Sequence, residues 1–278
     1  MKVIFDRKNR LMKIAVYVGS AEVAADSRVK ALMSRLEGAG ISLYDIAAGQ
    51  ALDAETDMLM SVGGDGTFLS ASMLVAASGV PVIGVNLGRV GFLSENKPED
   101  VADALLTGEY SVEDRTLLKA VSDGEEESYA LNEFTVSRSG AAMLGVDVTI
   151  DGIALPTYWA DGLIVSTSSG STAYSLSVGG PIALPAAKVL IISPIAPHNL
   201  NVRPLVVPDD SMISVKVHSR DRKVKFTVDN RTIEVDAGAR MELSLAQFSL
   251  KRVRLNKSDF INALTEKLHW GEDVRNIK

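Results

Sequence analysis

The spacing of apolar residues divides the first hundred residues into short strands and helices that alternate along the chain. Apolar runs suited to buried strands lie at residues 13–18, 41–46, 57–62 and 80–85. Residues 23–36 repeat apolar side chains at helical spacing until Gly38 and Gly40, and residues 68–77 predict a second helix. Strands that alternate with helices over short connections are typical of a parallel sheet covered on both faces.

The pattern changes after about residue 115, where helical spacing nearly disappears. Short runs of alternating apolar and polar residues lie at 117–122, 128–137, 144–151, 163–168, 211–219, 224–229 and 240–250. Such spacing predicts an all-β domain. Helical spacing returns at residues 258–268, where Ser258 is a candidate N-cap. The apolar face predicted for this last helix consists of Phe260, Ile261, Leu264 and Leu268.

The sequence therefore predicts two domains and a returning helix. Residues 12–115 form an α/β domain with a parallel sheet, and residues 116–254 form a β-rich domain. Residues 255–278 contain a C-terminal helix that packs back on the first domain. The chain of 278 residues is long enough for two such domains.

Composition narrows the class of protein. The absence of cysteine excludes disulfides, thiolate zinc sites and a cysteine nucleophile, and the three histidines have no metal-site spacing, so no metal ligand is expected. A net charge of −6 without a basic cluster argues against nucleic acid as a partner. No apolar run reaches eighteen residues and the N-terminus lacks a cleavage site, so we expect a cytoplasmic protein without membrane contact. Met12 is an alternative start, which would make residues 1–11 an extension.

One stretch carries candidate chemistry: residues 61–67 read SVGGDGT and join a predicted strand to a predicted helix. Glycines permit a sharp turn and close approach of a phosphate, and the N–H groups that open a helix favour an anion. Asp65 complicates that interpretation, because a carboxylate repels phosphate unless a cation intervenes or the carboxylate transfers a proton. The structural alternative is an ordinary turn with an aspartate cap. Neither GxxxxGK[ST] nor GxGxxG is present.

Further blocks follow in order. They are PVIGVNLGRVGFLSE at 81–95, LNEFTVSR at 131–138, ADGLIVSTSSGSTAYSLSVGGPI at 160–182, SPIAPHNLNVRPLVVP at 193–208 and FTVDN at 226–230. With VGGDGTFL, this set resembles the NAD kinases from about residue 13 to the final helix. The resemblance implies transfer of the γ-phosphoryl group of ATP, with Mg²⁺ or another divalent cation, to the 2′-hydroxyl of the adenosine ribose of NAD, giving NADP. It also implies a two-domain homo-oligomer, either a dimer or a tetramer.

Two other functions are compatible with parts of this pattern. Diacylglycerol and sphingosine kinases share Gly-Gly-Asp-Gly-Thr, but a GTGND-like stretch follows in those enzymes and none occurs here. A catalytically idle NAD(H)-binding regulator on the same fold stays open. The intact Asp65 argues against it, because a protein that only binds needs no general base.

The resemblance assigns roles to the glycine-rich stretch. Asp65 is the expected general base for the ribose hydroxyl and also contacts NAD together with Gly66. Gly63, Gly64 and Thr67 present N–H groups and a hydroxyl to the donor phosphates. The stretch contains no lysine or arginine, so a divalent cation is expected to neutralise the phosphates. If Asp65 is the base, a turn-exposed Asp65→Asn change is expected to cost under about 1 kcal/mol of stability and to lower kcat, whereas the cap alternative predicts a modest loss of stability with kcat nearly intact.

The NAD site is expected mainly in the second domain. Asn132 and Glu133, inside a strand pattern, are assigned to the adenine and ribose side, and Asp161 to the nicotinamide end. Phe92 either borders adenine or packs in the core. The resemblance places the remaining NAD contacts at Ser169, Thr172, Ala173, Tyr174, Ser175, Leu176, Ser177 and Ala196.

The sequence departs from the family pattern at four positions. Ser70 and Trp159 stand where basic residues are common, Arg231 follows Asp229 and Asn230 where the family has DGQ, and Ser168 replaces a proline. The Ser168 departure is expected to alter only the stiffness of its loop, whereas the others bear on phosphate and NAD contacts. The choice between ATP and polyphosphate, and between NAD and NADH, stays open, as does inhibition by NADP(H).

Overall fold

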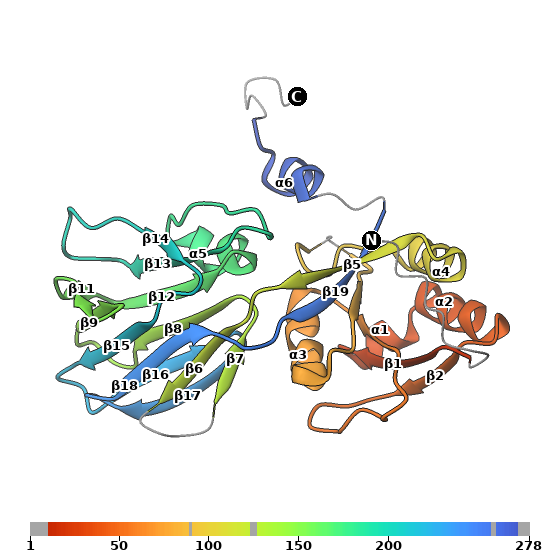
Figure 1. Cartoon of the computed structure of the whole chain (residues 1–278), viewed down its shortest axis with the longest axis horizontal. Helices are drawn as coiled ribbons and strands as arrows, with labels where there is room; N and C mark the ends of the chain where they lie inside the picture. The colour runs from red at the N-terminus through yellow and green to blue at the C-terminus, as the bar shows by residue number, and fades with distance from the viewer. Residues whose placement is uncertain (1–10, 89–90, 123–126, 257–259, 272–278) are drawn as a thin grey trace. The chain divides into compact units, whose positions relative to one another are not determined.

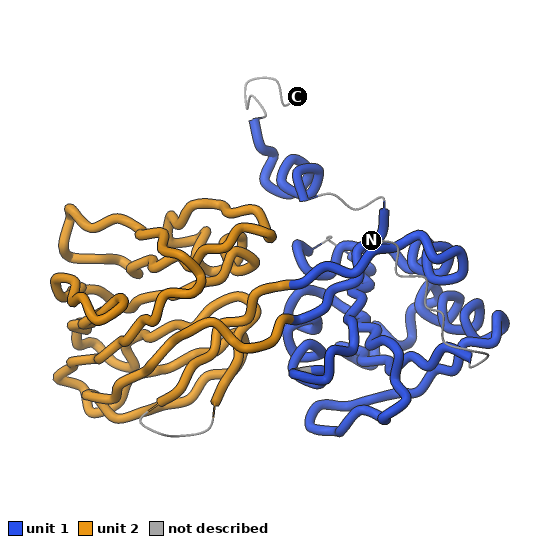
Figure 2. The backbone as a smooth tube through the Cα atoms, in the orientation of Figure 1, with its two compact units in different colours: residues 1–114, 250–278 blue, residues 115–249 orange. Residues whose placement is uncertain are grey.

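The computed structural model describes residues 11–88, 91–122, 127–256 and 260–271, and it divides the chain into two compact units (Figure 2). Unit 1 comprises Met1–Asp114 and Leu250–Lys278, and unit 2 comprises Arg115–Ser249. Residues 1–10 of the predicted extension lie outside the described residues, as does the predicted N-cap Ser258.

The chain returns to unit 1 earlier than predicted. We predicted that the β-rich domain extends to residue 254, and that residues 240–250 form one strand. The structure instead ends strand β18 (Arg240–Leu245) in unit 2 and begins strand β19 (Leu250–Leu255) in unit 1, where it pairs in parallel with β4 (Val82–Val85). The returning segment therefore supplies a sheet strand as well as a helix, because alternation alone does not tell which sheet a strand joins.

Unit 1 is built on a six-stranded sheet in the order β2-β1-β3-β4-β19-β5 (Figure 1). Its other strands are β1 (Lys13–Val18), β2 (Ser42–Asp45), β3 (Met58–Val62) and β5 (Tyr110–Arg115). Its helices are α1 (Ala21–Ala25), α2 (Ser27–Gly38), α3 (Asp65–Val75), η1 (Ala76–Ser78), α4 (Pro98–Thr107) and α6 (Phe260–Leu268). The pairs β1–β2, β1–β3 and β3–β4 are parallel, which confirms the predicted α/β class.

Both faces of this sheet are covered. Alternate residues such as Ile14, Met60 and Ile83 pack in one core with α2 and α4. The residues between them, such as Leu59, are also fully buried, and Gly84 lies so close to Phe68 of α3 that a Cβ there would be 3.0 Å from its ring. Helix α3 therefore covers the second face, and burial on both sides explains the unbroken apolar runs.

Two predicted helices differ in detail from the structure. The helix predicted at residues 23–36 is broken at Asp26, which adopts an extended conformation and accepts a hydrogen bond from the backbone N–H of Arg28, thereby capping α2. In α6 the buried residues are Ala263 and Leu264, whereas Ile261 is 53% exposed, so the predicted apolar face was wrong at that position. Helix α4 was not predicted, although Pro98 at its start and Gly108 at its end are ordinary helix signals.

Unit 2 contains two packed antiparallel sheets, as predicted for a β-rich domain. The seven-stranded sheet contains β6 (Leu118–Ser122), β7 (Ser128–Ala130), β9 (Leu144–Ile150), β10 (Ile153–Ala154), β11 (Tyr158–Ala160), β15 (Ile213–His218) and β18. The six-stranded sheet contains β8 (Glu133–Arg138), β12 (Gly162–Thr167), β13 (Val189–Ile195), β14 (Leu205–Pro208), β16 (Lys223–Val228) and β17 (Arg231–Asp236). A short 3₁₀ helix η2 (Ser169–Thr172) and helix α5 (Tyr174–Ser177) follow β12.

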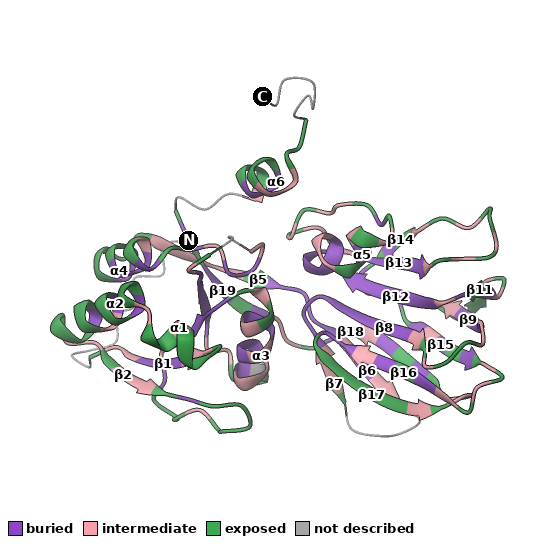
Figure 3. Cartoon of the chain, turned by 180° about the vertical axis from the view of Figure 1, so that it is seen from behind, coloured by how far each residue is buried: buried purple, intermediate pink, exposed green. Residues whose placement is uncertain are grey.

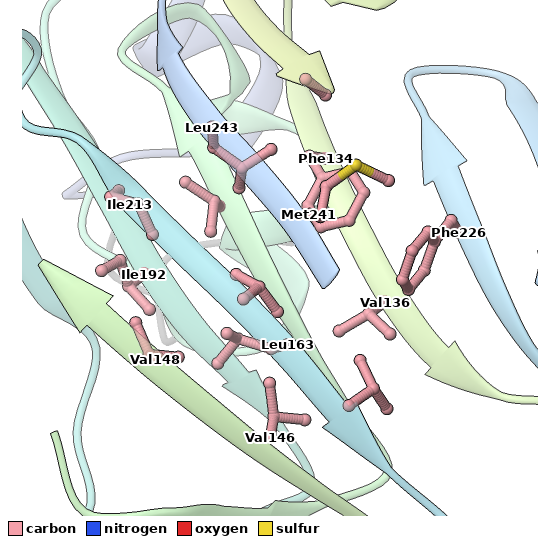
Figure 4. Close-up of a cluster of buried hydrophobic side chains, with 14 of the residues drawn as sticks. Phe134, Val136, Val146, Val148, Leu163, Ile192, Ile213, Phe226, Met241 and Leu243 are labelled. Carbon is pink, nitrogen blue, oxygen red and sulfur yellow. The ribbon is translucent and has the colours of Figure 1, made fainter. Parts of the chain in front are cut away.

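The core of unit 2 lies between its two sheets. Side chains from β8 and β12, such as Phe134 and Leu163, meet side chains from β9 and β15, such as Val148 and Ile213 (Figure 4). Figure 3 shows the central strands β8 and β12 buried along nearly their whole length. Because consecutive residues of β12 are buried, both faces of this strand are covered.

The run predicted as one strand at residues 128–137 is two strands in different sheets. Strand β7 ends at Ala130 and β8 begins at Glu133, so Asn132 lies in the break and not inside a strand as predicted. The backbone N–H groups freed by the break bond to Asp229. A side-chain acceptor distant in sequence thus allows the chain to change sheets.

Candidate active site

The glycine-rich stretch forms a tight turn between β3 and α3. Gly63 has a φ of 152°, and a Cβ there would lie 2.4 Å from the hydroxyl of Thr67, so only glycine fits. The Gly63 N–H donates to the Val85 carbonyl at 2.8 Å, and its carbonyl accepts from Ser94 Oγ at 2.6 Å. Gly64 and Gly66 are exposed, with no atom within 4 Å of where a Cβ would lie. The turn is therefore held in place by hydrogen bonds at Gly63 and is exposed at Gly64 and Gly66.

Asp65 is the first residue of α3, and its carboxylate holds a second segment of the chain. Oδ2 accepts from the Phe92 N–H at 2.8 Å, and Oδ1 accepts from the N–H groups of Leu93 at 3.1 Å and Ser94 at 2.8 Å. The structural alternative of a simple local cap does not describe this contact, because the acceptor anchors residues far along the sequence. The expected cost of under about 1 kcal/mol for Asp65→Asn is therefore too low, since three hydrogen bonds to a charged acceptor depend on this carboxylate.

Residues 91–95, here termed the anchored turn, have further supports. A Cβ on Gly91 would lie 1.7 Å from Asp65 Oδ1, so the backbone there packs directly on the carboxylate. The buried Arg252 of β19 donates to the Leu93 carbonyl at 3.1 Å and pairs with Glu95 at 2.6 Å. The returning strand thus helps to shape the turn that contacts Asp65.

Phe92 packs against the C-terminal helix. Its ring centroid lies 5.8 Å from that of Phe260, and the ammonium of Lys267 lies 3.9 Å from the Phe92 centroid. Of the two readings of Phe92, packing within the fold is the one these contacts describe, and contact with adenine stays a prediction.

In unit 2, Asp229 organises the predicted Asn-Glu pair. Asp229 has a φ of 52°, and its carboxylate accepts from the backbone N–H groups of Leu131 (2.8 Å), Asn132 (2.8 Å) and Glu133 (3.1 Å). Burial raises the pKa of Asp229, while these N–H groups lower it. This role of Asp229 was not predicted, because in the sequence Asp229 stands out only as part of a divergent motif. An aspartate directly after a strand, before a turn, was the available signal.

Glu133 is a buried carboxyl group with unmet hydrogen-bonding capacity. Burial and the nearby charge of Asp229 raise the pKa of Glu133 to about 8, although the backbone N–H of Tyr174 favours its charged form. Glu133 Oε2, Asn132 Oδ1 and Ser166 Oγ are buried without a hydrogen-bond partner, and Ser166 lies opposite Glu133 in the β8–β12 ladder. Buried polar atoms ordinarily have partners, so this cluster is suited to a polar ligand.

The serine-rich loop folds over the same end of β12. Gly170 packs on Asn132, because a Cβ there would lie 2.1 Å from the Asn132 carbonyl oxygen. Ser175 is buried and its Oγ lies 3.2 Å from that of Ser193, whereas the ring-bearing Tyr174 is 42% exposed. The other predicted contacts in the loop are Ser169, which is buried, and Thr172, Ala173, Leu176 and Ser177, which are partly or fully exposed.

Asp161 and Ala196 lie at the opposite end of β12. The Asp161 N–H donates to the Ile195 carbonyl at 2.9 Å, and its carboxylate pairs with Arg138 through two contacts of 3.1 and 3.2 Å. Ala196 is exposed with a φ of 45°. The structure therefore groups the predicted NAD contacts of unit 2 at two places, separated by the six residues of β12, or about 20 Å.

The divergent positions have structural partners. Ser70 Oγ donates to the Gly66 carbonyl at 3.2 Å, Ser168 Oγ to the Pro185 carbonyl at 3.0 Å, and Arg231 to the Tyr129 carbonyl at 2.7 Å. Trp159 packs on Gly145 and stays 45% exposed. Ser168 thus has an anchoring bond that the expected change in loop stiffness did not include.

Neither a metal cluster nor a membrane helix is found in the described part of the chain. Among residues 11–88, 91–122, 127–256 and 260–271, no three His, Cys, Asp or Glu side chains are grouped as a metal site would require. Within the same residues, no helix has both the length and the apolar character to cross a bilayer.

Comparisons with known proteins cover nearly the whole chain. The ATP-NAD kinase N-terminal domain matches residues 15–110, and the ATP-NAD kinase C-terminal domain matches residues 131–255. An NAD kinase of Flavobacterium psychrophilum is 40% identical, covering 92% of this chain and 90% of its own length. An NAD kinase of Porphyromonas gingivalis is 38% identical, covering 95% of this chain and 100% of its own length.

Two solved structures share the fold. The crystal structure of yeast NADH kinase complexed with NADH is similar with a TM-score of 0.83 at 23% identity, covering 98% of this chain and 91% of that one. The crystal structure of an NAD kinase from Archaeoglobus fulgidus in complex with ATP has a TM-score of 0.76 at 26% identity, covering 93% and 99%. Because relatives about 40% identical match over nine-tenths of its length and both domain models match in order, this chain belongs to the NAD kinase family.

Proposed function

We propose that this protein is an NAD kinase that transfers the γ-phosphoryl group of ATP to the 2′-hydroxyl of the adenosine ribose of NAD. The observation that carries the proposal is the position of Asp65. In this member of the NAD kinase family, hydrogen bonds hold the Asp65 carboxylate in place beside an exposed glycine turn. The ribose oxygen forms a bond to the γ-phosphorus, the bond from that phosphorus to the bridging oxygen of ADP breaks, and the hydroxyl proton passes to Asp65. The products are NADP and ADP.

The Asp65 carboxylate has a hydrogen-bond acceptor position available for this hydroxyl group. An ionised carboxylate offers about four acceptor positions, and three N–H groups use three of them. One position therefore remains for the ribose hydroxyl. The three N–H groups also fix the orientation of the carboxylate, so little reorganisation accompanies the transfer.

A resident metal ion does not fit the described residues, because no carboxylate or histidine cluster is present among them. We propose instead that the divalent cation arrives as the complex with ATP and is part of the substrate. Gly64 and Thr67 would face the phosphates of that complex, since the backbone above Gly64 and Gly66 is open. The predicted Gly63 contact was wrong, because Gly63 is buried and its N–H donates to the Val85 carbonyl. The ATP complex of the archaeal relative supports ATP as the donor.

The unpartnered polar atoms of unit 2 suit the dinucleotide. Asn132 Oδ1 can accept from an amino group and Glu133 Oε2 can bond a ribose hydroxyl, which are groups that NAD carries. The further proposed contacts with NAD are Gly66, Phe92, Asp161, Ser169, Thr172, Ala173, Tyr174, Ser175, Leu176, Ser177 and Ala196. We also propose that the enzyme is a cytoplasmic homo-oligomer, a state that light scattering of the purified protein would test.

One observation favours the alternative of an NAD(H)-binding regulator without catalysis. Because Asp65 anchors three N–H groups, its structural role alone would explain its presence. An aspartate at this position is therefore also compatible with a protein that does not use it as a base. The two functions differ in one assay. Purified protein incubated with NAD, ATP and Mg²⁺ should form NADP, which a NADP-specific dehydrogenase detects. Binding of NAD without any NADP formation, from either ATP or polyphosphate, would select the regulator.

A further inference from the structure

Lys267 of the C-terminal helix reaches the anchored turn from a part of the sequence that lies outside every motif described above. Its ammonium donates a hydrogen bond to the Gly91 carbonyl and lies 3.9 Å from the centroid of the Phe92 ring. Phe260, nearly two turns earlier in α6, contacts the same ring. Helix α6 therefore holds the turn through one charged and one aromatic contact.

Gly91 is the point where this contact meets Asp65. Its Cα lies so close that an added Cβ would overlap Asp65 Oδ1 at 1.7 Å. Its N–H donates to the Ser94 carbonyl at 2.9 Å, which closes the turn, and Asp65 in turn accepts from the Phe92 and Ser94 N–H groups. A shift of Gly91 must therefore move either the carboxylate or the N–H groups that orient it.

The environment of Lys267 disfavours its positive charge on balance, so its pKa lies below the ordinary value. The side chain is partly buried, and burial lowers the pKa of Lys267, whereas the carboxylates of Asp65, Glu95 and Glu266 raise it and Arg252 lowers it. Placing a flexible ammonium in such a position has a cost in desolvation and in side-chain entropy. Its hydrogen bond to a backbone carbonyl beside the reacting carboxylate is the contact that offsets this cost.

We propose that Lys267 is a positioning residue for phosphoryl transfer, which acts by holding Gly91 and thereby the orientation of the Asp65 carboxylate. The proposal rests on the proposed kinase function. It predicts that loss of the ammonium slows the chemical step and leaves NAD binding nearly unchanged, because most predicted NAD contacts lie in unit 2 and an apolar stem at position 267 can still pack against Phe92.

The test compares full-length variants in the NADP-forming assay. Lys267→Met keeps the stem against Phe92 and removes the donor, Lys267→Arg keeps a cationic donor, and Lys251→Met makes the same change at an exposed lysine of the same unit. We expect Lys267→Met to lower kcat about 10- to 100-fold with KM for NAD within about twofold. Lys267→Arg should recover most of the loss, and Lys251→Met should match the wild type.

A double-mutant cycle separates positioning from general support of the fold. If Lys267 acts through Asp65, Lys267→Met should change kcat by less than about twofold in an Asp65→Asn background. The same fold-loss in both backgrounds would overturn the proposal, as would a raised KM for ATP with unchanged kcat, which indicates a phosphate contact. Wild-type protein that forms no NADP would overturn the kinase function and this role together, whereas full activity of folded Lys267→Met overturns only this role.

Discussion

Asp65→Asn is the variant that tests the candidate site most directly. Asparagine keeps the shape of the side chain and one carbonyl oxygen, but it cannot accept a proton. If its oxygen replaces Oδ1, the bonds from Leu93 and Ser94 persist, whereas the amide nitrogen then faces the Phe92 N–H. The substitution thus removes the base and one of three anchoring hydrogen bonds.

The two losses have different magnitudes. General-base catalysis contributes about 10² to 10⁴-fold, so kcat should fall by that factor. One lost hydrogen bond to a charged group costs about 1.5 to 3 kcal/mol of unfolding free energy. For a chain of this size, about 2 kcal/mol corresponds to a fall in Tm of about 4 to 8 °C. The variant should therefore stay folded at 25 °C and still bind NAD.

The assay measures kcat, the Kd for NAD by calorimetry, and Tm for the wild type and three variants. Ser94→Ala is the matched control for anchoring, because it removes the 2.6 Å bond to the Gly63 carbonyl and leaves the carboxylate in place. Asp103→Asn, at an exposed position of α4, controls for the loss of one charge. A general base requires a fall in kcat with Asp65→Asn that far exceeds the fall with Ser94→Ala. More than about a third of wild-type kcat in Asp65→Asn, or equal losses in both variants, would refute the assignment.

Three further predictions concern the pocket loop, the metal and pH. Tyr174→Ala should weaken NAD binding about 5- to 150-fold, by analogy with base stacking at about 1 to 3 kcal/mol, and an unchanged Kd in a folded variant would return Tyr174 to a packing role. Excess EDTA should abolish NADP formation. Full activity without a divalent cation would contradict this prediction. Because the pKa of Glu133 is raised from 4.5 to about 8, the folded state binds its proton more tightly than the unfolded state. Its contribution to stability is thus complete below pH 4.5 and is lost as pH rises through about 8. Urea unfolding at pH 5 and pH 8 should show that the free energy of unfolding of the wild type falls by about 2 to 4 kcal/mol more than that of Glu133→Gln. The same change with pH in both proteins would refute the buried, protonated state.

Local patterns predicted most strands and the α/β class because a strand that is buried on one or both faces has a recognisable spacing of apolar residues. Residues 13–18 and 57–62 appear as buried strands, and the glycine turn at residues 63–66 lies where the motif predicted it. What the sequence could not reveal was the pairing of distant segments. The break at Asn132 depends on Asp229, about a hundred residues later, so an unbroken strand was the natural expectation.

The candidate site shows the same division. Asp65, Asn132 and Glu133 were found from motif resemblance, whereas the residues that position them were missed. Arg252 and Lys267 reach the anchored turn from a strand and a helix more than 150 residues away, and each alone resembles an ordinary surface cation. The return of a C-terminal helix was predicted, but helical spacing does not show which residues of unit 1 its side chains contact, and the return of strand β19 was not predicted.

That return has a consequence for how the protein forms in the cell. Strand β19 lies between β4 and β5, so the sheet of unit 1 has a gap until residues 250–255 leave the ribosome. Unit 2 is continuous in sequence and can complete its sheets first. The earliest part of the chain to be synthesised is therefore the last to close, and until then the edges of β4 and β5 are exposed to chaperones and to other nascent chains.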